Sequence, residues 1–149
     1  MTPTQERMVN QTRDALALAH GDLTGQVIGA FYDVYNDLWR GYVESVYARS
    51  MVVELSARAI ACEREAPLVV RYRDIIVGEF RADLLVERKI IVEVKVGDKI
   101  TAAHQRQLLN YLRVSGLSVG LILNVGERPS VKRLIWTGER SQLPSTETR

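Results

Sequence analysis

The sequence predicts a mixed α/β fold, and three observations support this class. Apolar residues recur at steps of three and four between residues 23 and 59, the spacing of amphipathic helices. Segments rich in β-branched residues follow between residues 60 and 96, separated by short polar joints, as in consecutive antiparallel strands. A further helical pattern and two strand patterns complete the chain. We therefore predict a mixed central sheet flanked by helices and built as one unit.

Three helices are predicted, over residues 23–38, 43–59 and 101–114. Gly41 interrupts the helical spacing between the first two. Thr101 is suited to the N-cap of the third helix, because its hydroxyl can accept a hydrogen bond from a free backbone N–H group. Gly116 is suited to the left-handed position that follows a helix. The last helix is therefore predicted with defined ends.

Six strands are predicted, over residues 60–65, 68–72, 75–86, 89–96, 117–125 and 131–136. Pro67 is expected in the joint between the first two strands. Gly78 is expected to form a bulge or bend inside the third strand, because a strand glycine has no side chain to pack. The predicted order is thus two helices, three or four strands, a helix and two strands.

One domain is expected from the length of 149 residues, and the composition is that of an ordinary globular protein, 46% hydrophobic and 26% charged. We predict a polar N-terminal extension over residues 1–22, the domain over residues 23–137 and a flexible tail over residues 138–149. The net charge of +2 neither favours nor excludes a nucleic-acid partner.

Cysteine usage and hydropathy predict a protein of the reducing cytoplasm. Cys62 is the only cysteine, so an internal disulfide and a cysteine-based zinc site are excluded. No apolar run has the length of a membrane span, and the N-terminus lacks the hydrophobic segment of a signal peptide. No membrane partner is therefore expected.

The run RADLLVERKIIVEVKV, residues 81–96, predicts a hairpin with a three-residue loop at residues 87–89. This register makes one face apolar, pairing Val86 with Ile90, Leu84 with Val92, Ala82 with Val94 and Phe80 with Val96. The other face pairs Leu85 with Ile91, Asp83 with Glu93 and Arg81 with Lys95. A two-residue loop would pair Asp83 with Val92 and mix the faces, so the apolar pattern favours the longer loop.

The favoured register places two acids opposite each other. Their Cβ atoms would lie roughly 5 Å apart, and like charges so placed are destabilising. A divalent cation held by Asp83 and Glu93 would offset the repulsion, and oxygen ligands suit Mg²⁺ or Mn²⁺. Alternatively, Arg81 and Lys95 neutralise the acids on a solvated face. The convergence of two acids and a lysine on one face favours the metal site.

Asp83 followed by Glu93-Val94-Lys95 has the form D-x(n)-E-x-K, and with its flanking elements it resembles the αβββαβ core of PD-(D/E)xK nucleases. The stretch GYVESVY is similar to the signature of the GxxExxY protein family within that superfamily, at Gly41, Glu44 and Tyr47. The stretches RADLLVERKIIVEVKV and HQRQLLNYLRVSGLSVGLILNVG also resemble blocks of that family. The resemblance covers roughly residues 23–136.

The helix predicted after the hairpin, over residues 101–114, adds a further element. Gln107 and Tyr111 stand four residues apart on one face and resemble the Q-x-x-x-Y element of RecB-type exonucleases. The resemblance implies that Gln107 positions the catalytic lysine or a water and that Tyr111 contacts the substrate. Arg81 is also expected to contact the substrate. On structural grounds alone, Gln107 would be a solvated position and Tyr111 a core aromatic. His104, one turn earlier, is assigned no role in the chemistry.

The resemblance implies a metal-dependent nuclease. Asp83, Glu93, the Val94 carbonyl and Glu44 would hold Mg²⁺, with Mn²⁺ as a substitute, although Glu44 is also explained as a surface helix acid. Lys95 would hold the attacking water or stabilise transition-state charge. The expected reaction is hydrolysis of phosphodiester bonds in DNA, or in RNA, leaving a 5′-phosphate.

The chain departs from the family at three places. Val34-Tyr35 stands where relatives often carry Val-His, residues 38–41 read LWRG in place of Leu-Gly-Pro-Gly, and Ala82 replaces the proline of the first motif.

Two other functions remain open at this point. The fold can serve as a binding module that holds nucleic acid or a protein without cleavage. It can also serve in assembly, with a homodimer interface formed by Trp39, Tyr42 and Trp136, although core packing explains these residues equally.

Overall fold

The computed structural model describes residues 1–8, 10, 11 and 20–138 of the chain. Its elements are α2 (Gly21–Leu38), α3 (Glu44–Ala57), β1 (Cys62–Tyr72), β2 (Ile75–Val86), β3 (Ile90–Val96), α4 (Ala102–Ser115), β4 (Val119–Val125) and β5 (Pro129–Ile135). The predicted flexible tail, apart from residue 138, and much of the predicted N-terminal extension lie outside the described residues. No helix in the described ranges is long and apolar enough to cross a membrane.

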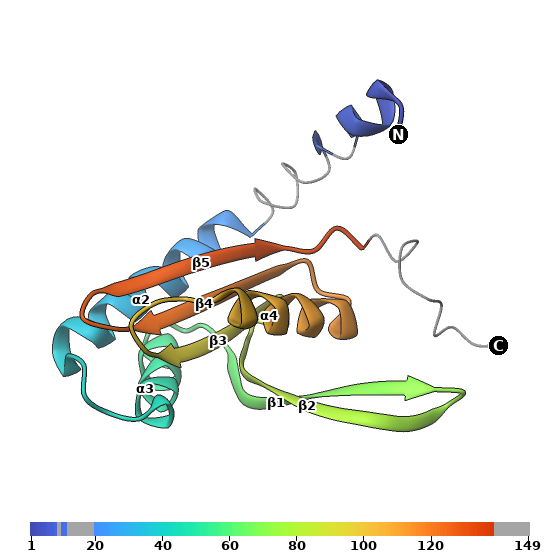
Figure 1. Ribbon diagram of the computed structural model, residues 1–149. Coiled ribbons are helices and arrows are strands. Elements are labelled where there is room, and N and C mark those ends of the chain that lie inside the picture. Colours follow the sequence, from blue (N-terminus) through green and yellow to red (C-terminus); the bar gives the residue numbers. More distant parts are fainter. Residues whose placement is uncertain (9, 12–19, 139–149) are drawn as a thin grey trace.

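The five strands form one sheet in the order β1-β2-β3-β4-β5 (Figure 1). Strands β3 and β4 are parallel, and the other neighbouring pairs are antiparallel. Helix α4 supplies the crossover that a parallel pair requires. The predicted mixed sheet flanked by helices is therefore confirmed.

Two apolar clusters cover the two faces of the sheet. Residues of α2 and α3, including Phe31 and Met51, pack with Leu84 and Leu121 on one face. Residues of α4, including Leu108 and Leu112, pack with Ile91 and Ile122 on the other. Strand β4 is buried along its whole length because both of its faces are covered.

Strand β1 is continuous, which corrects the prediction of two strands separated at Pro67. Pro67 lies inside β1 and is paired with Arg81 of β2. A proline is tolerated here because β1 is an edge strand, where one side of the backbone needs no partner. Further along, the register shifts between Val70 and Arg71, opposite Gly78, which confirms a bulge at the predicted place.

The predicted hairpin register is confirmed as far as Leu84. The ladder joins Val86 to Ile90, Leu85 to Ile91 and Leu84 to Val92. The loop at residues 87–89 is closed by the Lys89 N–H group, which donates to the Val86 carbonyl at 2.9 Å. The alternative two-residue loop is therefore excluded.

Beyond Leu84 the prediction is wrong, because β2 and β3 separate. Strand β2 continues paired with β1 alone, and the two strands leave the sheet as a two-stranded ribbon (Figure 1). Ala82 packs against the α4 cluster, whereas Leu84 packs against the α2 and α3 cluster. Phe80 is 45% exposed. Two-stranded ribbons twist more strongly than sheets, and this twist moves Ala82 and Phe80 off the predicted face.

Helix α4 has the predicted ends. The Thr101 hydroxyl accepts from the His104 N–H group at 3.1 Å, and His104 Nδ1 accepts from the Thr101 N–H group at 3.1 Å. This reciprocal capping box defines the first turn. Gly116 has a φ of 75° and ends the helix in the left-handed conformation. The capped start determines which residues of α4 face the sheet.

The contact between α4 and β4 gives a first prediction. A Cβ atom on Gly120 would lie 2.7 Å from Leu108 Cδ1, and the Leu108 side chain is fully buried. We expect Gly120→Ala to lower the free energy of unfolding by about 1–3 kcal/mol in urea titrations, because the extra methyl overpacks the core.

Gly25→Ala is the control, because its Cβ would meet nothing within 4 Å in a helix interior. It should stabilise by about 0.5–1 kcal/mol. Equal stabilities for Gly120→Ala and the parent chain would contradict the close packing.

Candidate active site

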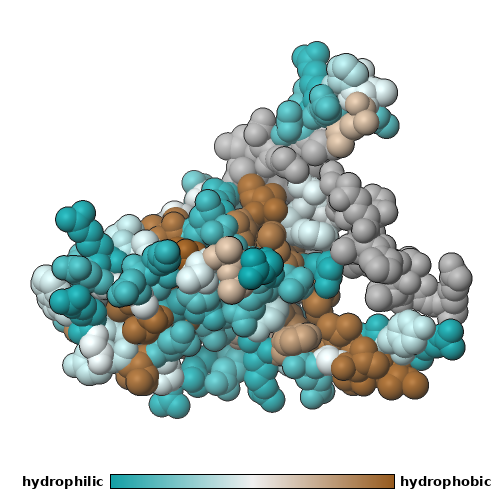
Figure 2. Space-filling model, in the orientation of Figure 1, coloured by the Kyte–Doolittle hydropathy of each residue, from teal (hydrophilic) through white to brown (hydrophobic). Residues whose placement is uncertain are grey.

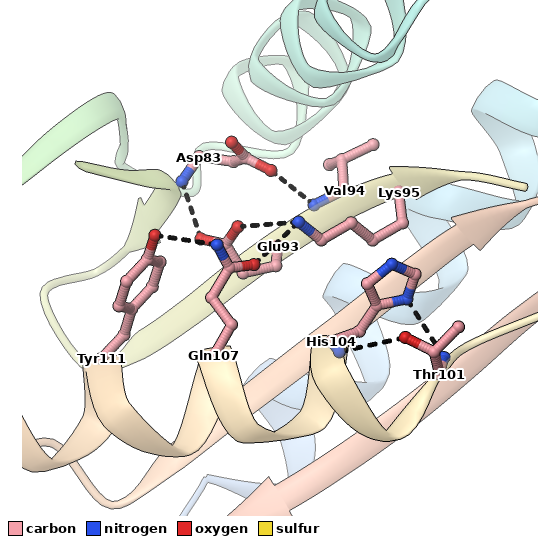
Figure 3. A network of polar contacts seen from close by, with 8 residues as sticks. All are labelled: Asp83, Glu93, Val94, Lys95, Thr101, His104, Gln107 and Tyr111. Atoms are coloured by element: carbon pink, nitrogen blue, oxygen red, sulfur yellow. Dashed lines mark hydrogen bonds and ion pairs between the residues drawn. The ribbon is translucent and has the colours of Figure 1, made fainter. Parts of the chain in front are cut away.

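Asp83 and Glu93, the carboxylate pair, lie where β2 and β3 separate. The Asp83 N–H group donates to Glu93 Oε1 at 3.0 Å, and the Val94 N–H group donates to Asp83 Oδ2 at 2.7 Å (Figure 3). Each carboxylate thus takes the place of a strand carbonyl and satisfies an N–H group that would otherwise lose its partner. Side chain and backbone hold each other in position.

A second set of contacts links β3 to α4. Lys95 Nζ lies 3.9 Å from Glu93 Oε2 and donates a hydrogen bond to Gln107 Oε1 at 2.8 Å. Gln107 Nε2 donates in turn to the Tyr111 hydroxyl at 3.2 Å. Because Gln107 and Tyr111 are four residues apart on α4, both point toward the acids (Figure 3). The network therefore joins five of the predicted residues from β2, β3 and α4: Asp83, Glu93, Lys95, Gln107 and Tyr111.

Electrostatically, the network has too little positive charge for its acids. Glu93 is 2% exposed. Burial raises the pKa of its carboxyl to about 8, with a further contribution from the charge of Asp83, while the Asp83 N–H group and Lys95 act in the opposite direction. Burial likewise raises the pKa of Tyr111, followed by the charges of Glu93 and Asp83. The positive charge of Lys95 therefore offsets only part of the cost of placing two carboxyl groups together in a buried site.

The carboxylate pair fits a divalent cation by the chemistry of its donors. Asp83 and Glu93 each use one oxygen for a backbone N–H group. Of the two remaining oxygens, Glu93 Oε2 lies 3.9 Å from Lys95 Nζ, beyond hydrogen-bonding distance, so that Asp83 Oδ1 and Glu93 Oε2 can both take a cation. Hard oxygen ligands suit Mg²⁺ and Mn²⁺, and a cation would lower the cost of two neighbouring charges. In the described part of the chain, no group of three or more His, Cys, Asp or Glu side chains is placed to hold a metal. Glu44 is exposed at the first turn of α3.

Arg81 is exposed on β2 and forms no ion pair with either acid. The alternative of a solvated face, neutralised by Arg81 and Lys95, is therefore wrong for this part of the structure. Glu93 is buried, and Ile91 and Leu85 of the same predicted face pack beneath α4. The face that carries the acids is covered by a helix, and its apolar residues belong to the core.

Several residues beside the network were missed as site residues. Phe80, expected in the core, lies with its ring centroid 5.9 Å from that of Tyr111. Phe80, Arg106, Asn110 and Arg113 line a cavity of about 540 Å³ between α4 and the ribbon. Over the ribbon itself, Figure 2 shows exposed apolar side chains. The spacing of these three residues on α4 is the signal that could have identified them.

The remaining predicted residues lie elsewhere. The Tyr35 hydroxyl contacts the carbonyls of Gly126 and Glu127, at 3.0 and 2.8 Å, and so joins α2 to the turn between β4 and β5. Trp39 and Tyr42 are exposed between α2 and α3, whereas Trp136 packs against the α4 cluster. Trp39 and Tyr42 therefore lie on one surface of the chain, and Trp136 does not belong to it.

The site has the order of elements that the sequence predicts for a nuclease-type core. An acid stands at the end of the β2–β3 ladder, and a Glu-x-Lys strand and a crossover helix follow it. A family profile described as the PD-(D/E)XK nuclease superfamily matches residues 21–134. The chain belongs to the PD-(D/E)XK nuclease superfamily, whose members generally use divalent metal ions. The narrower assignment to the GxxExxY family stays a prediction.

Among solved structures, the crystal structure of SSO0001 is similar, with a TM-score of 0.50 and 16% sequence identity. The similarity covers 61% of this chain and 48% of SSO0001, so the chain spans about half the length of that protein. At this identity the likeness concerns the fold alone. No protein with a curated description matches the chain.

The raised pKa of Glu93 gives a second prediction. Folding shifts this pKa from 4.5 to about 8, so the folded chain binds a proton that the unfolded chain releases. Stability therefore falls as the pH rises between these values. Glu93→Gln removes the titration, and its gain in unfolding free energy should grow from pH 5 to pH 9, reaching on the order of 2–5 kcal/mol.

The measurement is urea unfolding in EDTA across that pH range. Glu79→Gln, which changes an exposed acid on the neighbouring strand β2, is the matched control and should show no such growth. A pH-independent difference between Glu93→Gln and the parent chain would contradict the burial of a protonated Glu93.

Proposed function

We propose that this chain is a metal-dependent nuclease that hydrolyses phosphodiester bonds in DNA, or in RNA, with Mg²⁺ as the ion and Mn²⁺ as its substitute. One observation carries the proposal. The carboxylate pair is held by backbone N–H groups with an oxygen of each acid left for a cation, and Lys95 Nζ lies 3.9 Å from Glu93. A buried acidic site beside a lysine is suited to binding a cation and a phosphate together.

Asp83 and Glu93 are the proposed metal ligands, and the Val94 carbonyl and Glu44 are proposed to complete the set. When bound, the ion would supply Lewis acidity and positive charge at the scissile phosphate. The hydrogen bonds from the Asp83 and Val94 N–H groups hold the two carboxylates in place before any cation binds. This preorganisation reduces the rearrangement that binding requires.

Lys95 is proposed to orient the attacking water or to stabilise charge on the phosphate. Its ammonium has three donors, of which one is used by Gln107 and one is directed toward Glu93. The third remains for water or a phosphate oxygen. Gln107 acts as a positioning residue, since its amide oxygen holds the ammonium and its amide nitrogen is occupied by Tyr111.

Tyr111 and Arg81 are the proposed substrate contacts. The Tyr111 hydroxyl accepts from Gln107 and keeps its own proton for donation to a phosphate oxygen. Arg81 is exposed on β2, two residues from Asp83, and offers a planar donor group to the phosphate backbone. Both residues therefore adjoin the carboxylate pair.

Cleavage assays on labelled DNA and RNA with Mg²⁺ or Mn²⁺ test the function. We expect Asp83→Ala, Glu93→Ala and Lys95→Ala each to lower the rate by at least ~10²–10³-fold, because each removes a charge at the reacting phosphate. Asp83→Ala should also weaken Mn²⁺ binding measured by calorimetry. Lys99→Ala, an exposed lysine after β3, is the control for lost positive charge.

Normal cleavage by all three variants would contradict the proposed mechanism. Metal-independent binding of nucleic acid without cleavage would indicate the non-cleaving module instead.

Gln107 gives a separate prediction. Gln107→Ala should lower kcat about 10–100-fold with KM little changed, because Lys95 loses the acceptor that orients it. Metal affinity should stay the same, which separates positioning from metal binding. Gln105→Ala, on the same helix but outside the network, is the matched control. A change in KM alone would contradict the positioning role.

A further inference from the structure

We propose that the groove between α4 and the β1–β2 ribbon holds an unpaired nucleotide of the substrate strand. The substrate class is then single-stranded or frayed nucleic acid rather than an intact duplex. This assignment rests on the proposed nuclease function, because it places the groove beside the site of cleavage. The groove, its charges and its continuity with the network each support the inference.

The groove has two unlike walls. Arg106, Gln107, Asn110 and Tyr111 recur on one face of α4 at helical spacing and form the first wall. Residues of the ribbon beyond Asp83, including Phe80, form the second, which is mainly apolar. The cavity of about 540 Å³ lies in the size range of pockets that bind small organic groups. It is suited to a flat base with a polar edge.

Phe80 supplies a surface for stacking. Phe80 is 45% exposed, and its ring is inclined at 43° to the ring of Tyr111, with the centroids 5.9 Å apart. A base entering the groove would meet an aromatic face, and stacking of this kind is largely independent of base identity. The exposed amide of Asn110 offers both a donor and an acceptor to the base edge.

The charges of the groove match a nucleic-acid backbone. Arg106 and Arg113 line the cavity, and neither forms an ion pair with any described residue. Two guanidinium groups without acidic partners favour phosphates, which they can bind through paired hydrogen bonds. An apolar peptide segment would leave both charges unmatched, so a nucleotide is the better occupant.

The groove shares two residues with the network of the carboxylate pair. Gln107 and Tyr111 line the cavity and also belong to the chain of hydrogen bonds that ends at Lys95. A strand with one base beside Phe80 would thus run past the ammonium of Lys95. A base that is paired and stacked within a duplex cannot enter a pocket of this kind without leaving the stack. The groove therefore selects unpaired nucleotides.

Fluorescence anisotropy in EDTA tests the proposal without cleavage. The probes are a labelled single strand of about 12 nucleotides, in DNA and in RNA form, and a blunt hairpin duplex of the same composition. We expect the single strand to bind at least ~10-fold more tightly than the duplex. Comparison of the DNA probe with the RNA probe shows which of the two nucleic acids the groove prefers.

Variants place the binding in the groove. Phe80→Ala and Phe80→Leu should each weaken single-strand binding, by about 10-fold for alanine, because leucine keeps the apolar contact but lacks a stacking face. Arg106→Ala should weaken binding and reduce the slope of log affinity against log salt by about 1.

Tyr32→Ala is the matched aromatic control. Tyr32 is exposed on α2 and contacts Phe31 at the same 5.9 Å centroid distance, but it lies outside the groove. Lys132→Ala is the control for charge. Both control variants should bind as the parent chain does.

Photo-crosslinking supplies a second readout that does not depend on the folding of a variant. A strand that carries 5-iodouracil should crosslink to the peptides containing Phe80 or Tyr111. Crosslinks confined to other peptides would overturn the proposal. Equal affinity for single strand and duplex, parent-like binding by both Phe80 variants, or no binding of any probe would also overturn it.

These outcomes separate the two proposals. If Asp83→Ala abolishes cleavage while Phe80→Ala binds and cleaves normally, the nuclease stands and the groove is wrong. If single strands bind through Phe80 but no metal supports cleavage, the groove stands and the nuclease mechanism is wrong.

Discussion

The hydrogen bonds from the Asp83 and Val94 N–H groups to the carboxylate pair are the interactions on which the rest of the site depends. They allow β2 to leave β3 without stranding backbone donors in a partly buried position. The departure sends the β1–β2 ribbon away from the sheet and opens the cavity beside α4. The carboxylate pair and the groove thus have a common structural origin, because the same two side chains end the strand pairing and form the candidate metal site.

Burial of Glu93 gives the site its electrostatic character. A carboxyl group that keeps its proton to about pH 8 contributes little negative charge, and a cation would compete with that proton for the same oxygens. Lys95 is held by Gln107 instead of forming a close ion pair with Glu93, from which it stands 3.9 Å. Its positive charge is therefore not matched by a close carboxylate partner.

Local rules predicted much of this molecule, and pairing geometry limited the rest. The caps at Thr101 and Gly116 and the loop at residues 87–89 follow from side-chain chemistry and from alternation along a strand, which involve near neighbours in sequence. The grouping of Asp83 with Glu93 followed in the same way. The twist that carries Ala82 to the other cluster, the tolerance of Pro67 inside β1 and the burial of Glu93 all depend on distant partners. Periodicity in one segment cannot encode them.

The closed loop at residues 87–89 couples the lengths of the two strand segments that lead from it to the acids. Asp83 and Glu93 stand at the same fork because each lies the same number of residues from this loop. A single residue inserted in β3 before Glu93, with the loop unchanged, would turn this carboxylate to the face of Leu84 and Val92, which packs against α2 and α3, and away from the Asp83 N–H group. The two arms of the hairpin therefore have to change length together, whereas residues added to the loop itself would leave the two acids opposite each other.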